Sequence, residues 1–182
     1  IAAISAMQLA GGLEYLVYIA EKILYKNPKY INYLAPIVTY VLTIFAGTGH
    51  TAFSMIPVIV EVAKGENIRP SVPLSMSVVS SQVAITASPV SAAVIYMTGV
   101  LEPFGWSYPT LLAVWLLTTF LGCMVTAVIM TMFCKMDLST STVYQERLKE
   151  GLVKPPVGMQ EIKITSSAKL SVWIFLIGVI AV

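Results

Sequence analysis

Charged side chains are scarce in this chain, at 11% of its 182 residues. Soluble domains carry about 25%. The hydrophobic fraction is 57% and the mean hydropathy is +0.83, so the composition excludes an ordinary soluble domain and predicts an integral membrane protein. No basic cluster with interleaved aromatic residues is present, so nucleic acid is not an expected partner.

Residues that carry metal or covalent chemistry are also scarce. His50 is the only histidine and Asp137 the only aspartate, so neither a clustered metal site nor a catalytic triad is expected. Cys123 and Cys134 form no CxxC pair, and we expect both to be buried and reduced. The patterns GxSxG and HExxH are absent, so the sequence indicates neither an enzyme nor a resident cofactor.

What the chain does contain is two long uncharged stretches, Leu34 to Val60 and Leu74 to Leu101. The first is interrupted at Gly47-Thr48-Gly49-His50. As one straight helix it would be about 40 Å long, against a hydrocarbon core of about 30 Å. Two full crossings would need roughly 40 residues. We therefore expect residues 34–60 to form a re-entrant hairpin of two half-helices, with its tip at the glycines.

The second stretch is interrupted at Thr86-Ala87-Ser88-Pro89-Val90-Ser91. Pro89 lacks a backbone donor and pushes Ser88 away from helical geometry. Residues 74–101 are therefore predicted to be one crossing made of two half-helices. Residues 108–134 form a cleaner uncharged span.

These segments predict an all-α, polytopic membrane helix bundle. We expect a membrane core over residues 1–134 that is incomplete at its N-terminus, a cytoplasmic loop over 135–169, and the truncated start of a further span over 170–182. The chain is thus expected to be an excerpt of a longer polypeptide. Short helices are predicted at the membrane surface over 13–25 and in the loop over 145–152.

Lysine and arginine fall in three loops, 21–33, 61–73 and 135–169, whereas loop 102–107 contains none. If the first stretch returns to its own side and the second crosses, all 11 basic residues lie on one side. If both stretches cross, 8 basic residues lie on one side and 3 on the other. If only the second stretch returns to its own side, the division is 9 to 2. The positive-inside rule therefore favours a cytoplasmic location for the three loops and a periplasmic one for 102–107.

The two interruptions are the candidate site. A half-helix that begins inside the membrane presents unpaired N–H groups and the positive end of its dipole, which bind anions without a basic side chain. The carbonyls freed at the other half-helix ends are suited to a cation. The predicted substrate-binding residues are Gly47, Thr48, Gly49, His50, Thr86, Ala87, Ser88, Pro89 and Ser91.

Each of these residues also has a simpler interpretation. The glycines can serve close helix packing, and Pro89 can be a plain kink. His50 either titrates or donates to a carboxylate, or it is a neutral histidine satisfied by a backbone carbonyl. Ser81 and Gln82 either line the site or hydrogen-bond to a neighbouring helix.

Several strings of the sequence are similar to one transporter family. They are AAISAMQLAGGLEYL (2–16), EKILYKNPKY (21–30), LAPIVTYVLTIFAGTGH (34–50), PVIVEVAKGENIRP (57–70), QVAITASPVSAAVIYM (82–97) and RLKEGLV (147–153). Residues 3–168 resemble the anaerobic C4-dicarboxylate transporters of bacteria, the Dcu family. The resemblance is greater to the DcuA branch, although His50 is more like the DcuB branch.

The resemblance implies an inner-membrane carrier that exchanges fumarate, succinate, malate and aspartate, with fumarate or aspartate moving against succinate by alternating access. It also implies kinship with the ion-transporter superfamily, whose carriers pair a hairpin tip with an unwound helix in each half of an inverted repeat. These elements map onto 47–50 and 86–91. Better-known members have Ser-Asn-Thr there, where this chain has Gly-Thr-Gly and Ala-Ser-Pro. Coupling to Na⁺ or H⁺ therefore stays open.

Two other functions fit the same residues. One is a cation-coupled carrier for a different organic anion, or a cation/proton antiporter. The other is a membrane sensor subunit that binds dicarboxylate and signals through a partner such as a sensor kinase docked on loop 135–169. A homo-oligomer is compatible with either function. The remainder of the polypeptide and the lipid bilayer are expected partners in every case.

Overall fold

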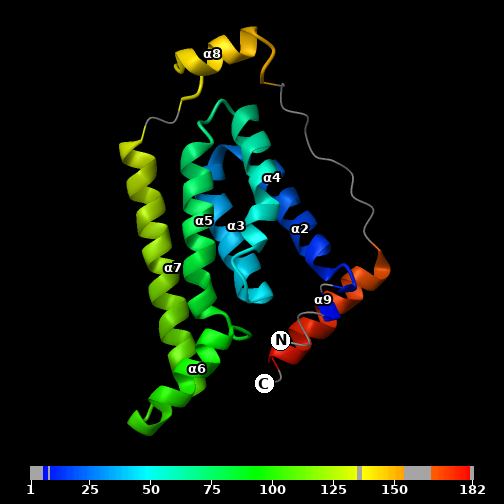
Figure 1. The fold of residues 1–182 in the computed structure, drawn as a ribbon, viewed down its shortest axis with the longest axis vertical. Coiled ribbons are helices and arrows are strands. Elements are labelled where there is room, and N and C mark those ends of the chain that lie inside the picture. Colours follow the sequence, from blue (N-terminus) through cyan, green and yellow to red (C-terminus); the bar gives the residue numbers. More distant parts are fainter. Residues whose placement is uncertain (1–5, 8, 135–136, 154–164, 181–182) are drawn as a thin grey trace.

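The computed structural model describes residues 6–7, 9–134, 137–153 and 165–180, and within these ranges it is helical with no strand. The elements are α2 (Gly12–Lys26), the 3₁₀ turn η1 (Pro28–Tyr30), α3 (Ile31–Ala46), α4 (Thr51–Gly65), α5 (Ser71–Ala84), η2 (Ile85–Ala87), α6 (Ala92–Leu101), η3 (Glu102–Phe104), α7 (Tyr108–Phe133), α8 (Thr142–Lys149) and α9 (Ser166–Ile180). Helices α3, α4, α5 and α7 run side by side along the long axis, with α8 at one end and α6 at the other (Figure 1). The predicted all-α membrane bundle is confirmed at this level.

Helices α3 and α4 form an antiparallel hairpin around residues 47–50, here named the first break. Helix α3 ends because Gly47 adopts φ +67°, a left-handed conformation that favours glycine. The Gly47 N–H donates to the carbonyl of Thr43 at 2.8 Å, which closes the last turn. At the far ends of the hairpin, η1 contacts both helices, so the start of α3 lies beside α4.

Helices α5 and α6 are separated by residues 85–91, here named the second break. The α-helix ends at Ala84, η2 adds one tight turn, and Ser88 and Ser91 are extended at ψ 123° and 132°. The chain bends by 44° between the helical segments Ser71–Ala87 and Ala92–Phe104. Both breaks therefore occur where the sequence predicts them, although Thr86 and Ala87 belong to the 3₁₀ turn rather than to the extended backbone.

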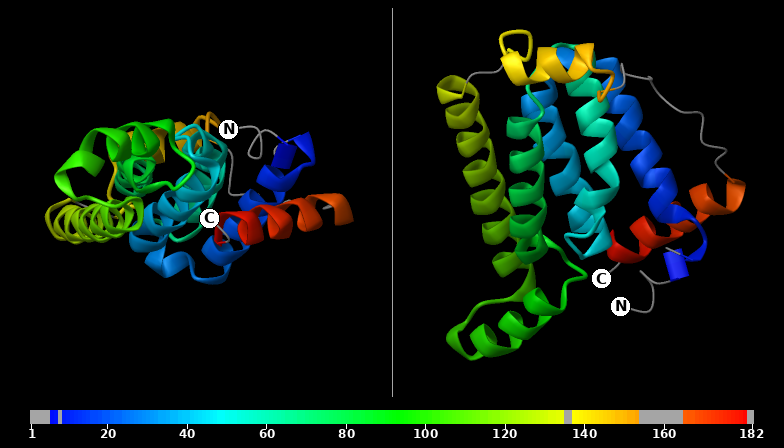
Figure 2. Two further views of the ribbon diagram at one scale, coloured as in Figure 1. Left: turned by 90° about the horizontal axis from the view of Figure 1, so that it is seen from below. Right: turned by 45° about the horizontal axis from the view of Figure 1, so that its top comes forward.

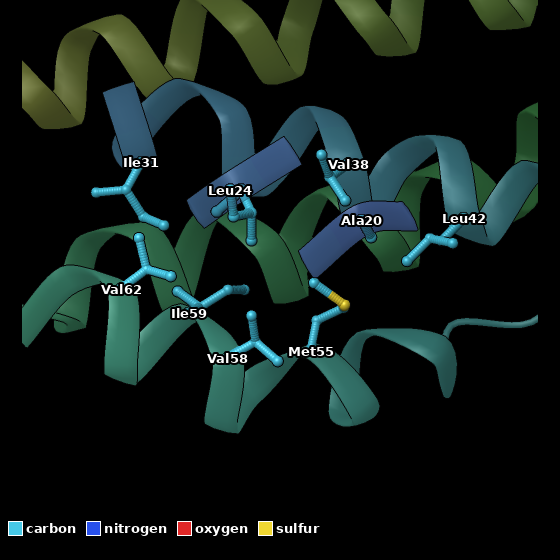
Figure 3. Close-up of a cluster of buried hydrophobic side chains, with 10 residues drawn as sticks. Ala20, Leu24, Ile31, Val38, Leu42, Met55, Val58, Ile59 and Val62 are labelled. Carbon is cyan, nitrogen blue, oxygen red and sulfur yellow. The ribbon is translucent and has the colours of Figure 1, made fainter. Parts of the chain in front are cut away.

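A shared apolar core joins α2, α3 and α4 on one side of the bundle (Figure 3). Its buried residues are Ala20, Leu24, Ile31, Ala35, Val38, Leu42, Met55, Val58, Ile59 and Val62. The hairpin is thus braced along its length by α2. Ile23 of α2 does not belong to this core and remains 40% exposed.

Helix α5 packs closely on α3 through small side chains. Ser77, Ser80, Ser81 and Ala84 are buried along one face of α5, and small residues allow helix backbones to approach in a membrane. The Thr39 hydroxyl lies 3.1 Å from the carbonyl of Ser77 across this interface. Helix α5 is therefore held directly against the hairpin that carries the first break.

Helix α7 covers α3 and α5 on the opposite side from α2. The Tyr40 hydroxyl lies 2.7 Å from that of Thr119, and the Tyr40 ring meets Phe120 edge-on at 5.5 Å. The outer face of α7 is apolar and exposed, as expected for a helix in contact with lipid or further helices. By length and composition, the described residues contain two candidate membrane spans, Pro28–Ala46 and Tyr108–Phe133, or three if Ser71–Ala87 and Ala92–Phe104 are one bent span.

The loop between α4 and α5 lies beside the segment that follows α7. The Leu138 N–H donates to the carbonyl of Asn67 at 2.8 Å, and Ile68 and Asp137 form an isolated bridge. The Ser139 hydroxyl and backbone N–H donate to Asp137 Oδ1 at 2.6 and 2.8 Å, which holds the pKa of this carboxyl below its usual value. The C-terminal ends of α4 and α7 therefore lie at the same end of the bundle.

Other predicted elements are shifted. The loop helix is α8, three residues earlier than expected, because Ser141 caps it by accepting the Tyr144 N–H at 3.4 Å. Helix α9 begins at Ser166 instead of residue 170 and crosses α2 (Figure 2). Both cysteines are free, but only Cys123 is buried, because Cys134 lies at the exposed end of α7. Residues 1–5 and 8 of the predicted membrane core fall outside the described residues.

Candidate functional site

The two breaks lie against each other. The Ser88 hydroxyl donates to the carbonyl of Ile44, in the last turn of α3, at 2.6 Å. The Ser81 hydroxyl lies 3.5 Å from the carbonyl of Gly49. A methyl group added at Gly49 would collide with the side-chain amide of Gln82. Two segments about 40 residues apart in sequence thus meet at one place, near the lower end of α5 in Figure 1.

Four helix ends converge there. Helices α4 and α6 begin at Thr51 and Ala92, whereas α3 and η2 end at Ala46 and Ala87. Helix α4 has no side-chain cap, and neither α4 nor α6 has an acidic residue in its first turn. The positive ends of these two helix dipoles are therefore not neutralised by nearby carboxylates. Residues 47–50 and 85–91 contain no formally charged side chain, with His50 neutral.

The predicted site residues divide by exposure. His50 and Thr86 are exposed; Gly47, Thr48 and Pro89 are half-buried; and Gly49, Ala87, Ser88 and Ser91 are buried. The Thr48 hydroxyl accepts the His50 N–H at 3.4 Å, and the Thr86 hydroxyl donates to Val83 within its own turn at 2.8 Å. Of the predicted hydroxyls, only those of Thr48 and Thr86 belong to residues that are not buried.

The hydroxyls of Ser88 and Ser91 are engaged inside the protein. Ser88 is 0% exposed, donates to Ile44, and accepts the Val90 N–H at 3.4 Å. Ser91 caps α6 by accepting the Ala93 N–H at 3.3 Å. Both serines therefore shape the second break and hold it against the first.

His50 occupies the position before α4, with its ring 5.9 Å from that of Phe53. Its ring nitrogens make no hydrogen bond within the part of the chain that the structure describes. The carbonyl partner considered from the sequence is thus not found among those residues. The imidazole keeps its hydrogen-bonding capacity at the exposed side of the tip.

Sequence reasoning missed several residues that build the site. The hydroxyls of Thr43 and Thr51 lie 3.0 Å apart and close the hairpin across its tip. Their placement as the nearest threonines flanking the Gly-Thr-Gly string was a usable signal. The Tyr108 hydroxyl donates to the carbonyl of Pro89 at 2.7 Å, which anchors the second break to the start of α7. No pattern in the sequence indicates this contact.

Apolar helices with two uncharged breaks in mutual contact are consistent with a membrane transporter, because irregular backbone is tolerated in a membrane only where protein or a cavity covers it. Comparison with known proteins agrees. The family described as "Anaerobic c4-dicarboxylate membrane transporter" matches residues 1–182, and the chain belongs to this family. It is a multi-pass protein of the bacterial inner membrane.

Individual relatives carry matching names. The chain is 63% identical over 182 residues to "C4-dicarboxylate transporter DcuA" of Helicobacter pylori (strain J99), covering 100% of the chain and 41% of the relative. It is 56% identical to the DcuA of Escherichia coli (strain K12), covering 100% and 42%. It is 35% identical over 192 residues to "Anaerobic C4-dicarboxylate transporter DcuB" of Escherichia coli O6:H1, covering 100% and 43%. The chain thus spans about two fifths of the length of these relatives. No solved structure matches it significantly.

Proposed function

We propose that this chain forms half of the substrate site of a carrier for C4-dicarboxylates, namely fumarate, succinate, malate and aspartate, working by antiport with alternating access. The observation that carries the proposal is the contact between the two breaks, which precede the N-termini of α4 and α6 and carry no formally charged side chain. A dianion is stabilised there by N–H donors and helix dipoles without a basic side chain. The transporter names of the family and of the relatives support the same substrate class.

In this proposal each predicted residue has a defined task. The Thr48 hydroxyl and the His50 ring donate to substrate carboxylates, and the Thr86 hydroxyl exchanges its Val83 acceptor for a substrate oxygen, because these groups are not buried. Backbone N–H groups at the starts of α4 and α6 supply the remaining donors. The residues Gly47, Gly49, Ala87, Ser88, Pro89 and Ser91 shape the backbone that presents those donors. The inverted repeat of the family would supply the second half of the site from outside this chain.

The hairpin is proposed to be re-entrant. Helix α4 has 15 residues and is about 23 Å long, shorter than a hydrocarbon core of about 30 Å. The preceding segment Pro28–Ala46, which joins η1 to α3, has 19 residues and reaches about 28 Å. Helix α7 has 26 residues, a length of about 39 Å, enough to cross. Loops 21–33, 61–73 and 135–169 are then cytoplasmic and 102–107 periplasmic. The contact between Asn67 and Leu138 supports a common side for loops 61–73 and 135–169, and the contacts of η1 with both α3 and α4 support the same side for 21–33.

Exchange of substrates, without a resident cation, is proposed as the coupling mode. Carbonyls at the breaks already accept hydrogen bonds: that of Thr43 from Gly47, that of Ile44 from Ser88, and that of Pro89 from Tyr108. Each of these carbonyls keeps one lone pair for another partner. Antiport is proposed because residues 47–50 and 85–91 supply hydrogen-bond donors for an anion and no acidic side chain for a cation.

The test is uptake of labelled fumarate by the full-length natural protein in vesicles preloaded with succinate. Thr48→Val and Thr86→Val each remove a proposed donor while keeping the side-chain shape, and each should lower uptake about tenfold. Thr126→Val is the matched control, since the Thr126 hydroxyl also bonds within its own helix, to Gly122 at 2.8 Å, but on the exposed face of α7.

Unchanged uptake in both site variants, at equal membrane abundance, would remove these hydroxyls from the site. Absence of dicarboxylate flux by the wild-type protein in purified proteoliposomes would overturn the carrier function and favour a sensor. Uptake that requires Na⁺ but no internal dicarboxylate would replace antiport by cation coupling.

A further inference from the structure

Gln82 differs from the other polar residues near the end of α5. Ser77, Ser80 and Ser81 are small and buried against α3, whereas Gln82 is exposed. Its long side chain nevertheless returns to the protein, because its amide lies against Gly49 in the first break. The amide therefore sits at the junction of the two breaks.

The hydrogen-bonding groups of this amide are not engaged by any of the residues that the structure describes. The neighbouring Ser81 hydroxyl lies 2.9 Å from the Val78 carbonyl and 3.5 Å from that of Gly49. The Gln82 amide, with two N–H donors and one acceptor, makes no hydrogen bond within the described ranges of the chain. Contact with the glycine positions the amide, while its donors remain available to a ligand.

The location suits a dicarboxylate. Gly49 lies two residues before Thr51, where α4 begins without a side-chain cap. An amide against Gly49 thus lies beside the N-terminus of α4, where the proposed function puts a substrate carboxylate. An amide donates to a carboxylate and carries no charge of its own, so it adds no electrostatic penalty for a second carboxylate nearby.

Resting on the proposed function, we infer that Gln82 contacts the substrate and helps determine its specificity, by donating its amide N–H to one carboxylate of the dicarboxylate. Gly49 is then required at the tip because any side chain there would displace the amide. This role is distinct from the helix-packing role of the buried serines on the same helix.

A charge introduced at this position should change which dicarboxylate is preferred. Gln82→Glu keeps the shape but replaces the N–H donors by a carboxylate. That carboxylate repels fumarate, which has no positive group, and attracts the ammonium group of aspartate. Gln82→Met removes the donors without adding charge. The matched control is Gln145→Glu, because Gln145 lies on α8, away from both breaks.

The experiment measures KM for fumarate and for aspartate uptake by the full-length protein in proteoliposomes. Gln82→Met should raise the KM for fumarate about tenfold or more, as expected for loss of a hydrogen bond to a charged group. Gln82→Glu should raise the ratio of the fumarate KM to the aspartate KM about tenfold, and Gln145→Glu should leave it unchanged. The ratio does not depend on how much of a variant folds, so a purely structural effect would not move it.

The outcomes separate this inference from the proposed function. If the wild-type protein transports dicarboxylates but both Gln82 variants keep the wild-type KM values and ratio, the role of Gln82 is overturned and the carrier function stands. If both KM values rise equally in Gln82→Glu, Gln82 does not select substrate and the inference is likewise overturned. If the wild-type protein transports no dicarboxylate, the proposed function fails, and this inference with it.

Discussion

The two glycines of the first break are required for different physical reasons. Gly47 is needed for its backbone conformation, since φ is +67°. Gly49 is needed for space, since an added methyl group would meet the Gln82 amide. A sequence shows both as the same letter, so only the structure separates a conformational requirement from a steric one.

Gly47→Ala should destabilise the protein by about 1–2 kcal/mol, because an L-residue pays that amount in the left-handed region. Gly99→Ala is the control: Gly99 lies inside α6 with open space around it, and alanine is the better helix former. Thermal unfolding of the detergent-purified protein measures the difference. Equal melting temperatures for the two variants would contradict the assignment of strain to Gly47.

Ser88→Ala should also destabilise the protein, by about 1–3 kcal/mol, because it removes the donor to the Ile44 carbonyl at a fully buried position. Thr86→Val should leave the melting temperature nearly unchanged, because the exposed Thr86 hydroxyl bonds only within its own turn. For uptake measured per folded molecule, the order of the two effects is reversed. Thr86→Val should lower uptake more than Ser88→Ala does. A stable Ser88→Ala protein would show that the breaks meet without this bond.

At the scale of elements, helix lengths and helix-breaking residues made both breaks predictable. Uncharged stretches too long for one crossing and too short for two had to be interrupted, and Gly47 and Pro89 indicated where. Exact bounds were not predictable. Helix α8, for example, begins after Ser141 because that side chain caps it, and Gly151 at φ +71° follows its end.

The hydrogen-bond partners within the site were likewise not predictable from the sequence. A row of hydroxyls predicted the place, but not which of them face outward. The partner of Ser88 is a backbone carbonyl 44 positions earlier, and every residue type supplies a carbonyl. Only the packing of α5 on α3 selects Ile44, and that packing depends on small side chains distributed over two helices.

The close approach of α3 and α5 gives a prediction for these elements. Ser80 is 0% exposed, and its hydroxyl has no hydrogen-bond partner in the described structure. Ser80→Leu should destabilise the protein by about 1–3 kcal/mol through overpacking, whereas Ser80→Ala should be tolerated because it removes an unsatisfied group. Val79→Leu, at a 49% exposed neighbour, controls for added bulk. Denaturation midpoints compare the three variants, and a tolerated Ser80→Leu would contradict close packing.

For the whole molecule, sidedness is the testable property. In a Cys123→Ala, Cys134→Ala background, single cysteines at Lys29 and Gly65 mark the two outer ends of the hairpin, and one at Glu102 marks the opposite end of the bundle. A membrane-impermeant maleimide should label Glu102→Cys in spheroplasts, and Lys29→Cys and Gly65→Cys only after lysis. Labelling of the two hairpin positions from opposite sides would refute the re-entrant arrangement.

The absence of formal charge at the breaks also has an electrical consequence. In the proposed function, a dianion bound to this half of the site keeps its two negative charges, because residues 47–50 and 85–91 supply no counter-charge when His50 is neutral. Moving two charges against 100 mV costs about 4.6 kcal/mol. Swapping one dianion for another costs nothing in the same field. Potassium-diffusion potentials imposed with valinomycin should therefore leave fumarate–succinate exchange unaffected and suppress one-way fumarate entry into a negative interior.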